Sequence, residues 1–239
     1  MIETKNSHKT LRFIITGGSS GIGRAIALEM ARSKHSFFLT GRNKEKLQSV
    51  ADTINNMGGE AFFGVGDVGD VDEVETLFSE AFKLLKGVDI LVANAGVGYF
   101  GLLEEMTVLQ FDEQFKTNVR GVFLWLRKVL PIMKQQNSGQ IVVTSSNLGL
   151  NTAGRASIYA ATKHAVQAMV NSLREELKGT LVKAATINPG SVSTPWFDGK
   201  KVDHAKMLTA EDVAKVARVI IDQTETSNID HILILPGVN

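Results

Sequence analysis

The chain has 239 residues, of which 44% are hydrophobic, and a formal net charge of +1. This length fits one large α/β domain, and the apolar content is enough for a sizeable core. The balanced charge, without any block of like charges, argues against a nucleic-acid partner or an anionic membrane. The absence of cysteine excludes disulfides, thiolate metal ligands and cysteine nucleophiles.

The five histidines are scattered without the spacing of a metal site, so no metal is expected. Residues 1–10 are polar and mixed in charge, and they lack the apolar stretch of a signal peptide. No apolar run reaches the ~18 residues of a membrane-spanning helix. We therefore expect a cytoplasmic protein with a polar N-terminal tail at 1–10 and a single domain at 11–239.

Strand-like and helix-like segments alternate along the whole chain. Short apolar runs predict strands at 11–16, 36–40, 61–65, 88–94, 140–146, 183–188 and 231–235. Apolar residues at helical spacing predict helices at 20–33, 43–57, 71–85, about 109–135, 157–177 and 210–222. Several strands are apolar on both faces, as in a parallel sheet covered by helices on both sides. The predicted fold class is α/β: a doubly wound parallel sheet (Rossmann fold) of about seven strands with helices on both faces.

A glycine-rich turn, TGGSSGIG at 16–23, follows the first predicted strand. Glycine allows a tight turn and a close approach of backbone N–H groups to an anion, and the next helix presents its N-terminus to phosphate. The spacing alone is weak evidence, but its place between a strand and a helix favours a dinucleotide site. The candidate contacts in this turn are Gly17, Ser19, Ser20, Gly21, Ile22 and Gly23.

The end of the second predicted strand is where the adenosine ribose of a dinucleotide would lie. NAD sites commonly place an acid near this point, whereas an arginine suits the 2′-phosphate of NADP. The sequence here is Thr40, Gly41, Arg42, with no acid at hand. Arg42 therefore favours NADP(H) as the cofactor; the alternative is a solvated turn residue near a helix cap.

Further candidates follow the next two predicted strands, at the carboxyl edge of the sheet, where ligands bind in this architecture. Asp67, with Val68 beside it, can accept a hydrogen bond from the adenine amino group or serve as a loop or cap residue. Asn94, Ala95 and Gly96 either contact the cofactor or form a simple turn. Their position at the edge favours cofactor contact.

The predicted helix at 157–177 carries a phenol and an ammonium on its core-facing stripe. At ~100° per residue, this stripe contains Tyr159, Lys163, Val166, Val170, Leu173 and Leu177. Residues four apart on a helix are neighbours, so Lys163 can lower the pKa of Tyr159 toward neutrality and make the phenol a useful acid or base. The alternative is a snorkelling lysine beside a half-buried tyrosine.

Taken in order, these motifs resemble those of the short-chain dehydrogenase/reductase family, in its single-domain branch. The resemblance covers nearly everything from Leu11 to the C-terminus. It rests on TGGSSGIG, NAG at 94–96, Asn118, Ser146, Tyr159 with Lys163, and Pro189 with Gly190. The interval to Tyr159 selects Ser146 rather than Ser145 as the family's catalytic serine.

The resemblance implies a role for each of these residues. Tyr159 would exchange a proton with the carbonyl oxygen while the nicotinamide carries the hydride. Lys163 would lower the pKa of the phenol and hold the nicotinamide ribose. Ser146 would orient the carbonyl oxygen, and Asn118 would fix a kink and a water in a proton relay. The plainer alternatives are that Ser146 ends a strand and that Asn118 is an ordinary helix residue.

The resemblance also implies cofactor contacts and a subunit interface further along the chain. Contacts with the nicotinamide and phosphates are expected from Pro189, Gly190, Val192 and Thr194. Residues 191–208, with Trp196 and Phe197, would form a substrate lid, or else a surface loop with a few apolar anchors. The helix at 157–177 and the long one before it, with Phe123, Trp125 and Leu126, would meet a second subunit in a homodimer or homotetramer; packing within the chain is the alternative.

The expected function is NADPH-dependent hydride transfer to the carbonyl, or from the alcohol, of a small, moderately apolar substrate. Ser20 stands where NADP-preferring relatives often carry a basic residue, so Arg42 bears most of the specificity argument. The ending HILILPGVN lacks the glycine-rich C-terminus common in 3-oxoacyl-carrier-protein reductases, which are the runner-up. The non-enzymatic alternative is a catalytically idle NADP-binding sensor, which would not need a complete Ser, Tyr and Lys set.

Overall fold

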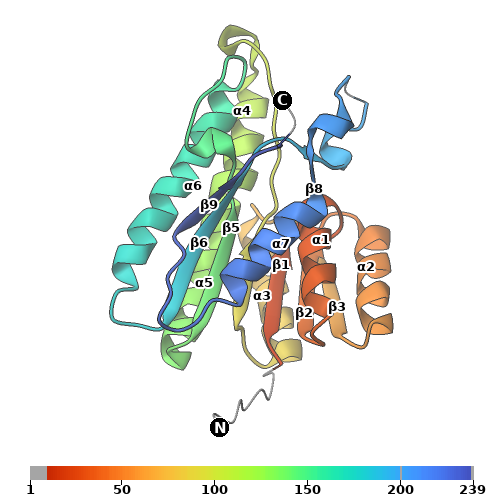
Figure 1. Ribbon diagram of the computed structural model, residues 1–239, viewed down its shortest axis with the longest axis vertical. Coiled ribbons are helices and arrows are strands. Elements are labelled where there is room, and N and C mark those ends of the chain that lie inside the picture. The colour runs from red at the N-terminus through yellow and green to blue at the C-terminus, as the bar shows by residue number, and fades with distance from the viewer. Residues whose placement is uncertain (1–9, 200, 238–239) are drawn as a thin grey trace.

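The computed structural model describes residues 10–199 and 201–237, so the expected tail at 1–10 lies outside the described residues except for Thr10. Seven strands form one parallel sheet in the order β3-β2-β1-β4-β5-β6-β9. These strands are β1 Arg12–Thr16, β2 Ser36–Gly41, β3 Glu60–Val65, β4 Ile90–Ala93, β5 Gly139–Thr144, β6 Val182–Pro189 and β9 His231–Ile234. Helices lie on both sides of the sheet (Figure 1), which confirms the predicted fold class.

The α-helices of the described chain connect these strands. They are α1 Gly21–Ala31, α2 Lys44–Asn56, α3 Val71–Leu85, α4 Val108–Phe115, α5 Gly121–Gln136, α6 Ser157–Glu176 and α7 Ala210–Ile221. Side chains of Asn43, Asp70 and Thr209 accept hydrogen bonds from the first turns of α2, α3 and α7, which fixes where these helices begin. None of the helices within 10–199 and 201–237 combines the length and the apolar character needed to cross a membrane.

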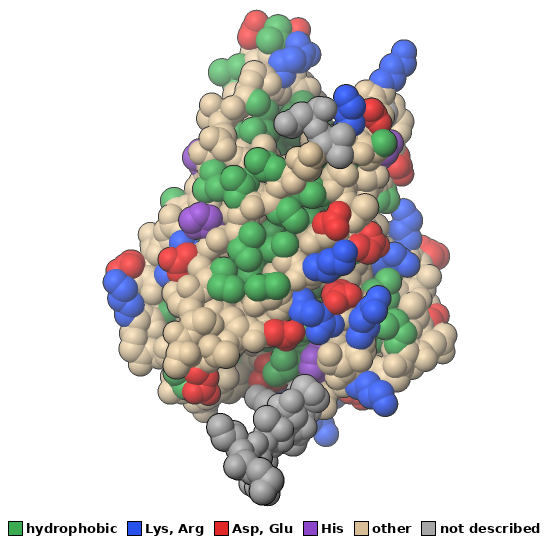
Figure 2. Space-filling view, viewed as in Figure 1, with side chains coloured by type: hydrophobic (Ala, Val, Ile, Leu, Met, Phe, Trp, Pro, Cys, Tyr) green, Lys and Arg blue, Asp and Glu red, His purple; other side chains and the backbone are tan. Residues whose placement is uncertain are grey.

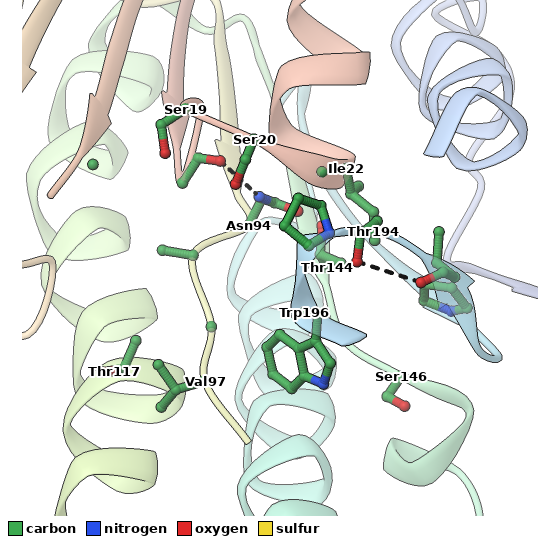
Figure 3. A pocket seen from close by; sticks show the side chains of 18 of the residues that line it. Ser19, Ser20, Ile22, Asn94, Val97, Thr117, Thr144, Ser146, Thr194 and Trp196 are labelled. Atoms are coloured by element: carbon green, nitrogen blue, oxygen red, sulfur yellow. Dashed lines mark hydrogen bonds between the residues drawn. The ribbon is translucent and has the colours of Figure 1, made fainter. Parts of the chain in front are cut away.

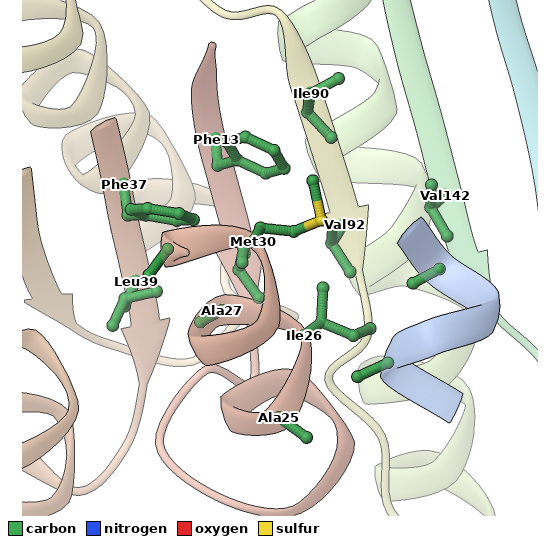
Figure 4. Packing of buried hydrophobic residues seen from close by; sticks show 14 of the residues in the cluster. Phe13, Ala25, Ile26, Ala27, Met30, Phe37, Leu39, Ile90, Val92 and Val142 are labelled. Carbon is green, nitrogen blue, oxygen red and sulfur yellow. The ribbon is translucent and has the colours of Figure 1, made fainter. Parts of the chain in front are cut away.

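Successive side chains of a strand point to opposite faces of the sheet, and the central strands β1, β4 and β5 are buried on both faces. The edge strand β9 is only half-buried. In β1, Phe13 and Ile15 pack with α1, α2 and α7, whereas Ile14 packs with α3, α5 and α6. Figure 4 shows the first of these clusters, with Met30 of α1 between the sheet residues Phe13 and Val92. This two-sided burial explains why the strands read as continuous apolar runs.

The strand order changes direction beside β1. From β1 the chain continues outward to β2 and β3 on one side, and β4, β5, β6 and β9 follow on the other. Loops that leave neighbouring strands toward opposite sides leave a crevice at the carboxyl edge, which is where open α/β sheets hold ligands. The glycine turn at 16–23 and the segment at 94–96 both lie at this edge.

The long helix predicted at about 109–135 is interrupted by a π turn, η2 Lys116–Arg120, between α4 and α5. Such wide turns are rare and often occur at functional positions. Asn118 lies in this turn and is 1% exposed. Its Oδ1 accepts a hydrogen bond from the Val97 N–H at 2.8 Å, and its Nδ2 donates to the Val97 carbonyl at 2.8 Å. The irregular turn thus joins α4 and α5 to the loop after β4.

The segment at 191–208 contains short elements that the sequence did not predict. β7 Val192–Ser193 and β8 Leu208–Thr209 pair as a separate two-stranded sheet, with the 3-10 turns η4 Pro195–Phe197 and η5 His204–Lys206 between them. Strands of two residues are too short for an alternating pattern to be read. Of the three expected interface residues, Trp125 and Leu126 are 1% and 4% exposed and pack in the chain's own core, which corrects that expectation for them, whereas Phe123 is 48% exposed.

Candidate active site

A cavity of about 400 Å³ lies at the carboxyl edge of the sheet (Figure 3), and its size is that of a ligand site. The predicted residues that line it are Gly17, Ser19, Ser20, Gly21, Ile22, Arg42, Asp67, Val68, Asn94, Ala95, Gly96, Ser146, Tyr159, Lys163, Pro189, Gly190, Val192 and Thr194. Gly23 and Asn118 lie outside this lining. The lining residues that were not proposed as site residues are Gly41, Gly66, Val97, Thr117, Thr144, Ser145, Ser191, Pro195, Trp196 and Phe197, the last four of which lie in the predicted lid.

The turn after β1 depends on glycine at three of its positions. Gly17 and Gly21 have φ angles of +65° and +52°, which other residues rarely adopt. At Gly23, a Cβ atom would lie 2.3 Å from the Gly17 carbonyl oxygen and 2.6 Å from Asn94 Nδ2. Gly23 therefore allows α1 to approach the turn closely, whereas its neighbours form the cavity wall.

The first turn of α1 has free backbone donors that fit a phosphate group. Its N-cap residue Ser20 makes no side-chain cap hydrogen bond, and the first turn contains no acidic residue. The N-termini of α2, α3 and α7 are capped by contrast. An uncapped N-terminus with its positive dipole end at a cavity is suited to an anion such as the pyrophosphate of a dinucleotide.

Asn94 holds this turn in place through hydrogen bonds. Its Nδ2 donates to the Thr16 and Gly17 carbonyl oxygens at 3.2 and 3.4 Å, and its backbone N–H donates to Thr16 Oγ1 at 3.0 Å. Figure 3 shows the Asn94 amide directed toward the turn that carries Ser19 and Ser20. The NAG segment therefore borders the cavity and also holds the glycine turn in shape.

Asp67 is engaged by a residue that the sequence did not single out. Its Oδ2 accepts a hydrogen bond from Lys116 Nζ at 2.7 Å, and its Oδ1 accepts from the Gly69 N–H at 2.9 Å. Burial raises the pKa of Asp67, but these two bonds and the positive charges of Lys116 and Arg42 together outweigh burial, so the net pKa is lowered and the carboxylate is ionised. Arg42 is exposed at the cavity wall and forms no hydrogen bond or salt bridge with the described residues, so its guanidinium can meet a ligand.

The pKa of the Tyr159 phenol is raised, whereas the sequence predicted that Lys163 would lower it toward neutrality. Burial raises the pKa of Tyr159 to about 12, and a hydrogen bond with Ser146 offsets only part of this rise. Lys163 Nζ is 5.7 Å from the centre of the Tyr159 ring and donates instead to the Thr144 carbonyl at 2.9 Å. The ammonium thus faces the end of β5, and in this state the phenol keeps its proton.

Lys163 itself is 4% exposed, and burial lowers its pKa to about 8. It therefore still carries a positive charge near neutral pH, inside a site that is largely shielded from water. The nearby serines have separate roles. The Ser146 hydroxyl is near enough to the Tyr159 phenol to lower its pKa somewhat, and it donates to Asn147 Oδ1 at 3.1 Å. Ser145 Oγ donates to the Lys163 carbonyl at 3.3 Å. This arrangement supports Ser146, and not Ser145, as the serine beside the phenol.

Thr162 connects the π turn to the helix that carries Tyr159. Asn118 Nδ2 donates to Thr162 Oγ1 at 3.1 Å, and Thr162 Oγ1 donates to the Tyr159 carbonyl at 2.7 Å. With the two bonds between Asn118 and Val97, this chain fixes the loop after β4 against α6. Thr162 is fully buried, and the sequence alone offered no signal for its role.

A family model described as short chain dehydrogenase matches residues 12–204. An uncharacterized oxidoreductase of Staphylococcus epidermidis is 30% identical over 223 residues, which are 93% of this chain and 96% of that protein. Among solved structures, an alcohol dehydrogenase from the archaeon Thermococcus sibiricus, complexed with 5-hydroxy-NADP, has a TM-score of 0.91 and 27% identity, covering 97% of this chain and 98% of that chain. A short chain dehydrogenase/reductase from Burkholderia phymatum in complex with NAD has a TM-score of 0.86 and 28% identity, covering 94% and 88%.

Proposed function

Because this chain belongs to the short-chain dehydrogenase family, we propose that it is an NADPH-dependent oxidoreductase acting on the carbonyl or secondary alcohol of a small, moderately apolar substrate. One observation carries the proposal. A single cavity has the uncapped N-terminus of α1 at one end and the Ser146, Tyr159 and Lys163 side chains at the other. A protein that only bound the dinucleotide would need the first end but not the second.

A bound nicotinamide supplies the hydride in reduction and accepts it in oxidation. Tyr159, with a pKa of about 12, is protonated near neutral pH and can give its proton to the carbonyl oxygen as that oxygen gains charge. The Ser146 hydroxyl beside it can orient the same oxygen. Lys163 remains cationic below its pKa of about 8 and, as in the family that the sequence resembles, would hold the nicotinamide ribose beside Tyr159. The protonated phenol is the form that carbonyl reduction requires.

The proposal is tested by mixing the purified protein with NADPH or NADH and a panel of ketones, aldehydes, diketones and 3-oxoacyl thioesters. We expect NADPH oxidation with at least one neutral ketone or aldehyde. A clear preference for the thioesters would instead identify a 3-oxoacyl-carrier-protein reductase. Tight NADPH binding with no turnover on any carbonyl would contradict the enzymatic proposal and favour the sensor.

Arg42→Ala is expected to weaken NADPH binding by about 10- to 100-fold and to leave NADH binding nearly unchanged. The reason is that one charge-assisted hydrogen bond to the 2′-phosphate contributes ~1.5 to 3 kcal/mol. The dissociation constants of both cofactors can be measured by fluorescence titration. Lys44→Ala, an exposed cation two positions further on that does not line the cavity, is the control. An unchanged ratio of NADPH to NADH affinity in Arg42→Ala would refute the NADP assignment.

We also propose that the protein forms a homodimer or homotetramer. The small residues Ala161, Ala168 and Ser172 of α6 are exposed and allow a second helix to approach closely. Figure 2 shows hydrophobic side chains gathered on the face where the edge strand β9 lies, and Leu233 and Leu235 there are 44% and 51% exposed. An exposed apolar edge strand offers a surface on which another chain can pair. Analytical ultracentrifugation at micromolar concentration should show a dimer or tetramer, and a monomer would contradict the proposal.

A further inference from the structure

Two aromatic side chains contact the ring of Tyr159: Trp196, which lines the cavity, and Phe100, which lies outside its lining. The ring centres of Phe100 and Tyr159 are 5.2 Å apart at an interplanar angle of 46°, and those of Trp196 and Tyr159 are 5.9 Å apart at 64°. Phe100 belongs to the loop after β4, whereas Trp196 belongs to η4 in the segment at 191–208. Figure 3 shows the indole of Trp196 at the same end of the cavity as Ser146.

Gly98 allows these two rings to come together. A Cβ atom at this position would lie 2.4 Å from Trp196 Cζ2 and 3.1 Å from Phe100 Cε2. The indole therefore packs directly against the glycine backbone, and any larger residue would push it away. The contact also explains why the segment at 191–208 lies against the loop after β4 at this point.

Among the described residues that line the cavity, Lys163 is the charged one at the reacting end, and the other charged side chains lie elsewhere. Among the described lining residues, the charged ones are Arg42, Asp67 and Lys163. Arg42 and Asp67 follow β2 and β3, on the far side of β1 from the strands β4 and β5 that lead to the reacting end. Lys163 Nζ donates a hydrogen bond to the Thr144 carbonyl. Arg155, whose carbonyl accepts a hydrogen bond from Gly101 in the loop after β4, forms a salt bridge of 3.8 Å with Glu105. A carboxylate or phosphate on the substrate would therefore find only the Lys163 ammonium, which is already bonded to the Thr144 carbonyl, and burying an anion without a cation of its own is costly.

We propose that the substrate is an uncharged aryl ketone or aryl aldehyde, whose aromatic ring is recognised by Phe100 and Trp196. The proposal rests on the carbonyl reduction proposed above and names the substrate class of that site. Pairs of aromatic rings gain affinity beyond the area that they bury, by roughly two- to tenfold for each pair. A saturated ring of the same size covers the same apolar surface and lacks this gain.

Binding can be measured without turnover through the fluorescence of Trp196. The chain has two tryptophans, of which Trp125 is buried in the core and Trp196 touches Tyr159. Acetophenone and cyclohexyl methyl ketone are titrated into protein saturated with NADP⁺, with Trp196→Phe as the variant that isolates the signal of Trp125. We expect acetophenone to bind at least twofold more tightly than the saturated ketone.

Phe100→Leu keeps the apolar surface and removes one ring, so it should reduce this preference. Phe82→Leu is the matched control, because Phe82 on α3 is 39% exposed and Phe100 is 46% exposed. Equal binding of the two ketones by the unmodified protein, or an equal loss of preference in both variants, would overturn the proposal.

Turnover separates a failure of this inference from a failure of the proposed reaction. With NADPH, kcat/KM should be highest for acetophenone, lower for cyclohexyl methyl ketone and lowest for acetoacetate. Faster reduction of acetoacetate or of the saturated ketone would overturn the aryl selectivity and leave the reductase function standing. Selective quenching of Trp196 by acetophenone with no reduction of any of the three would support the aromatic site and contradict the reductase function.

Discussion

Tyr159→Phe is expected to lower kcat for carbonyl reduction by about 10²- to 10⁴-fold, the usual contribution of a positioned general acid. The substitution removes only the hydroxyl, so the ring keeps its contacts with Phe100 and Trp196. NADPH affinity should therefore change little. Steady-state kinetics combined with a cofactor titration measure both effects, and a kcat within tenfold of the unmodified protein would show that another group supplies the proton.

The two adjacent serines provide a control for this prediction. The Ser146 hydroxyl lies beside the Tyr159 phenol and lowers its pKa, whereas Ser145 donates to the backbone of Lys163. Ser146→Ala should lower kcat, and Ser145→Ala should act only on stability. Equal losses of kcat in the two variants would indicate a general disturbance of this turn and not a loss of carbonyl orientation.

Lys163→Met is expected to stabilise the free protein and to lower its kcat by about 10- to 1,000-fold. Burial lowers the pKa of Lys163 from the ordinary 10.5 to about 8, which corresponds to roughly 3 kcal/mol of destabilisation while the lysine is charged. Methionine has a similar length and carries no charge. Part of the gain is offset because the Thr144 carbonyl loses its 2.9 Å hydrogen bond, so the net increase in the free energy of unfolding should be about 1 to 2 kcal/mol. The loss of kcat follows from removing the ammonium that would hold the nicotinamide ribose beside Tyr159.

The pH dependence gives this prediction a definite sign. The folded protein binds the Lys163 proton less tightly than the unfolded chain does, so the destabilisation is fully present below a pH of about 8. It is relieved as the pH rises from about 8 to 10.5, where the unfolded chain holds more protons. Urea unfolding should therefore show the advantage of Lys163→Met near neutral pH and its loss above pH 10. A variant that is less stable than the unmodified protein at neutral pH would contradict the account.

Much of the fold could be predicted because its signals are local. Strands buried on both faces read as continuous apolar runs, and helix starts such as Asn43, Asp70 and Thr209 have side chains suited to capping. The glycine turn and the Tyr159 and Lys163 pair could be found for the same reason, since their spacing in the sequence reflects their spacing in the structure. The carboxyl edge of the sheet then brings these local motifs to one cavity.

The features that could not be predicted depend on residues far apart in the sequence. Lys116 meets Asp67 across 49 positions, and Asn118 meets Thr162 across 44. No pattern in the sequence marks the π turn that aims Asn118 at the loop after β4. The predicted lowering of the Tyr159 pKa was wrong for a similar reason, because helical spacing gives the distance to Lys163 but not the depth of burial of the phenol.

The transfer of deuterium from NADPH to a ketone tests whether the protein is an NADPH-dependent reductase that uses Tyr159 as its acid. The protein is incubated with an aryl ketone and NADPH deuterated at the hydride-donating carbon, and the alcohol is analysed by mass spectrometry. We expect one deuterium at the carbinol carbon of the product. Deuterated NADH should give much less product, and Tyr159→Phe should give almost none in the same time. Equal amounts of labelled alcohol from the unmodified protein and from Tyr159→Phe, or no labelled alcohol from either, would contradict the proposed reductase function.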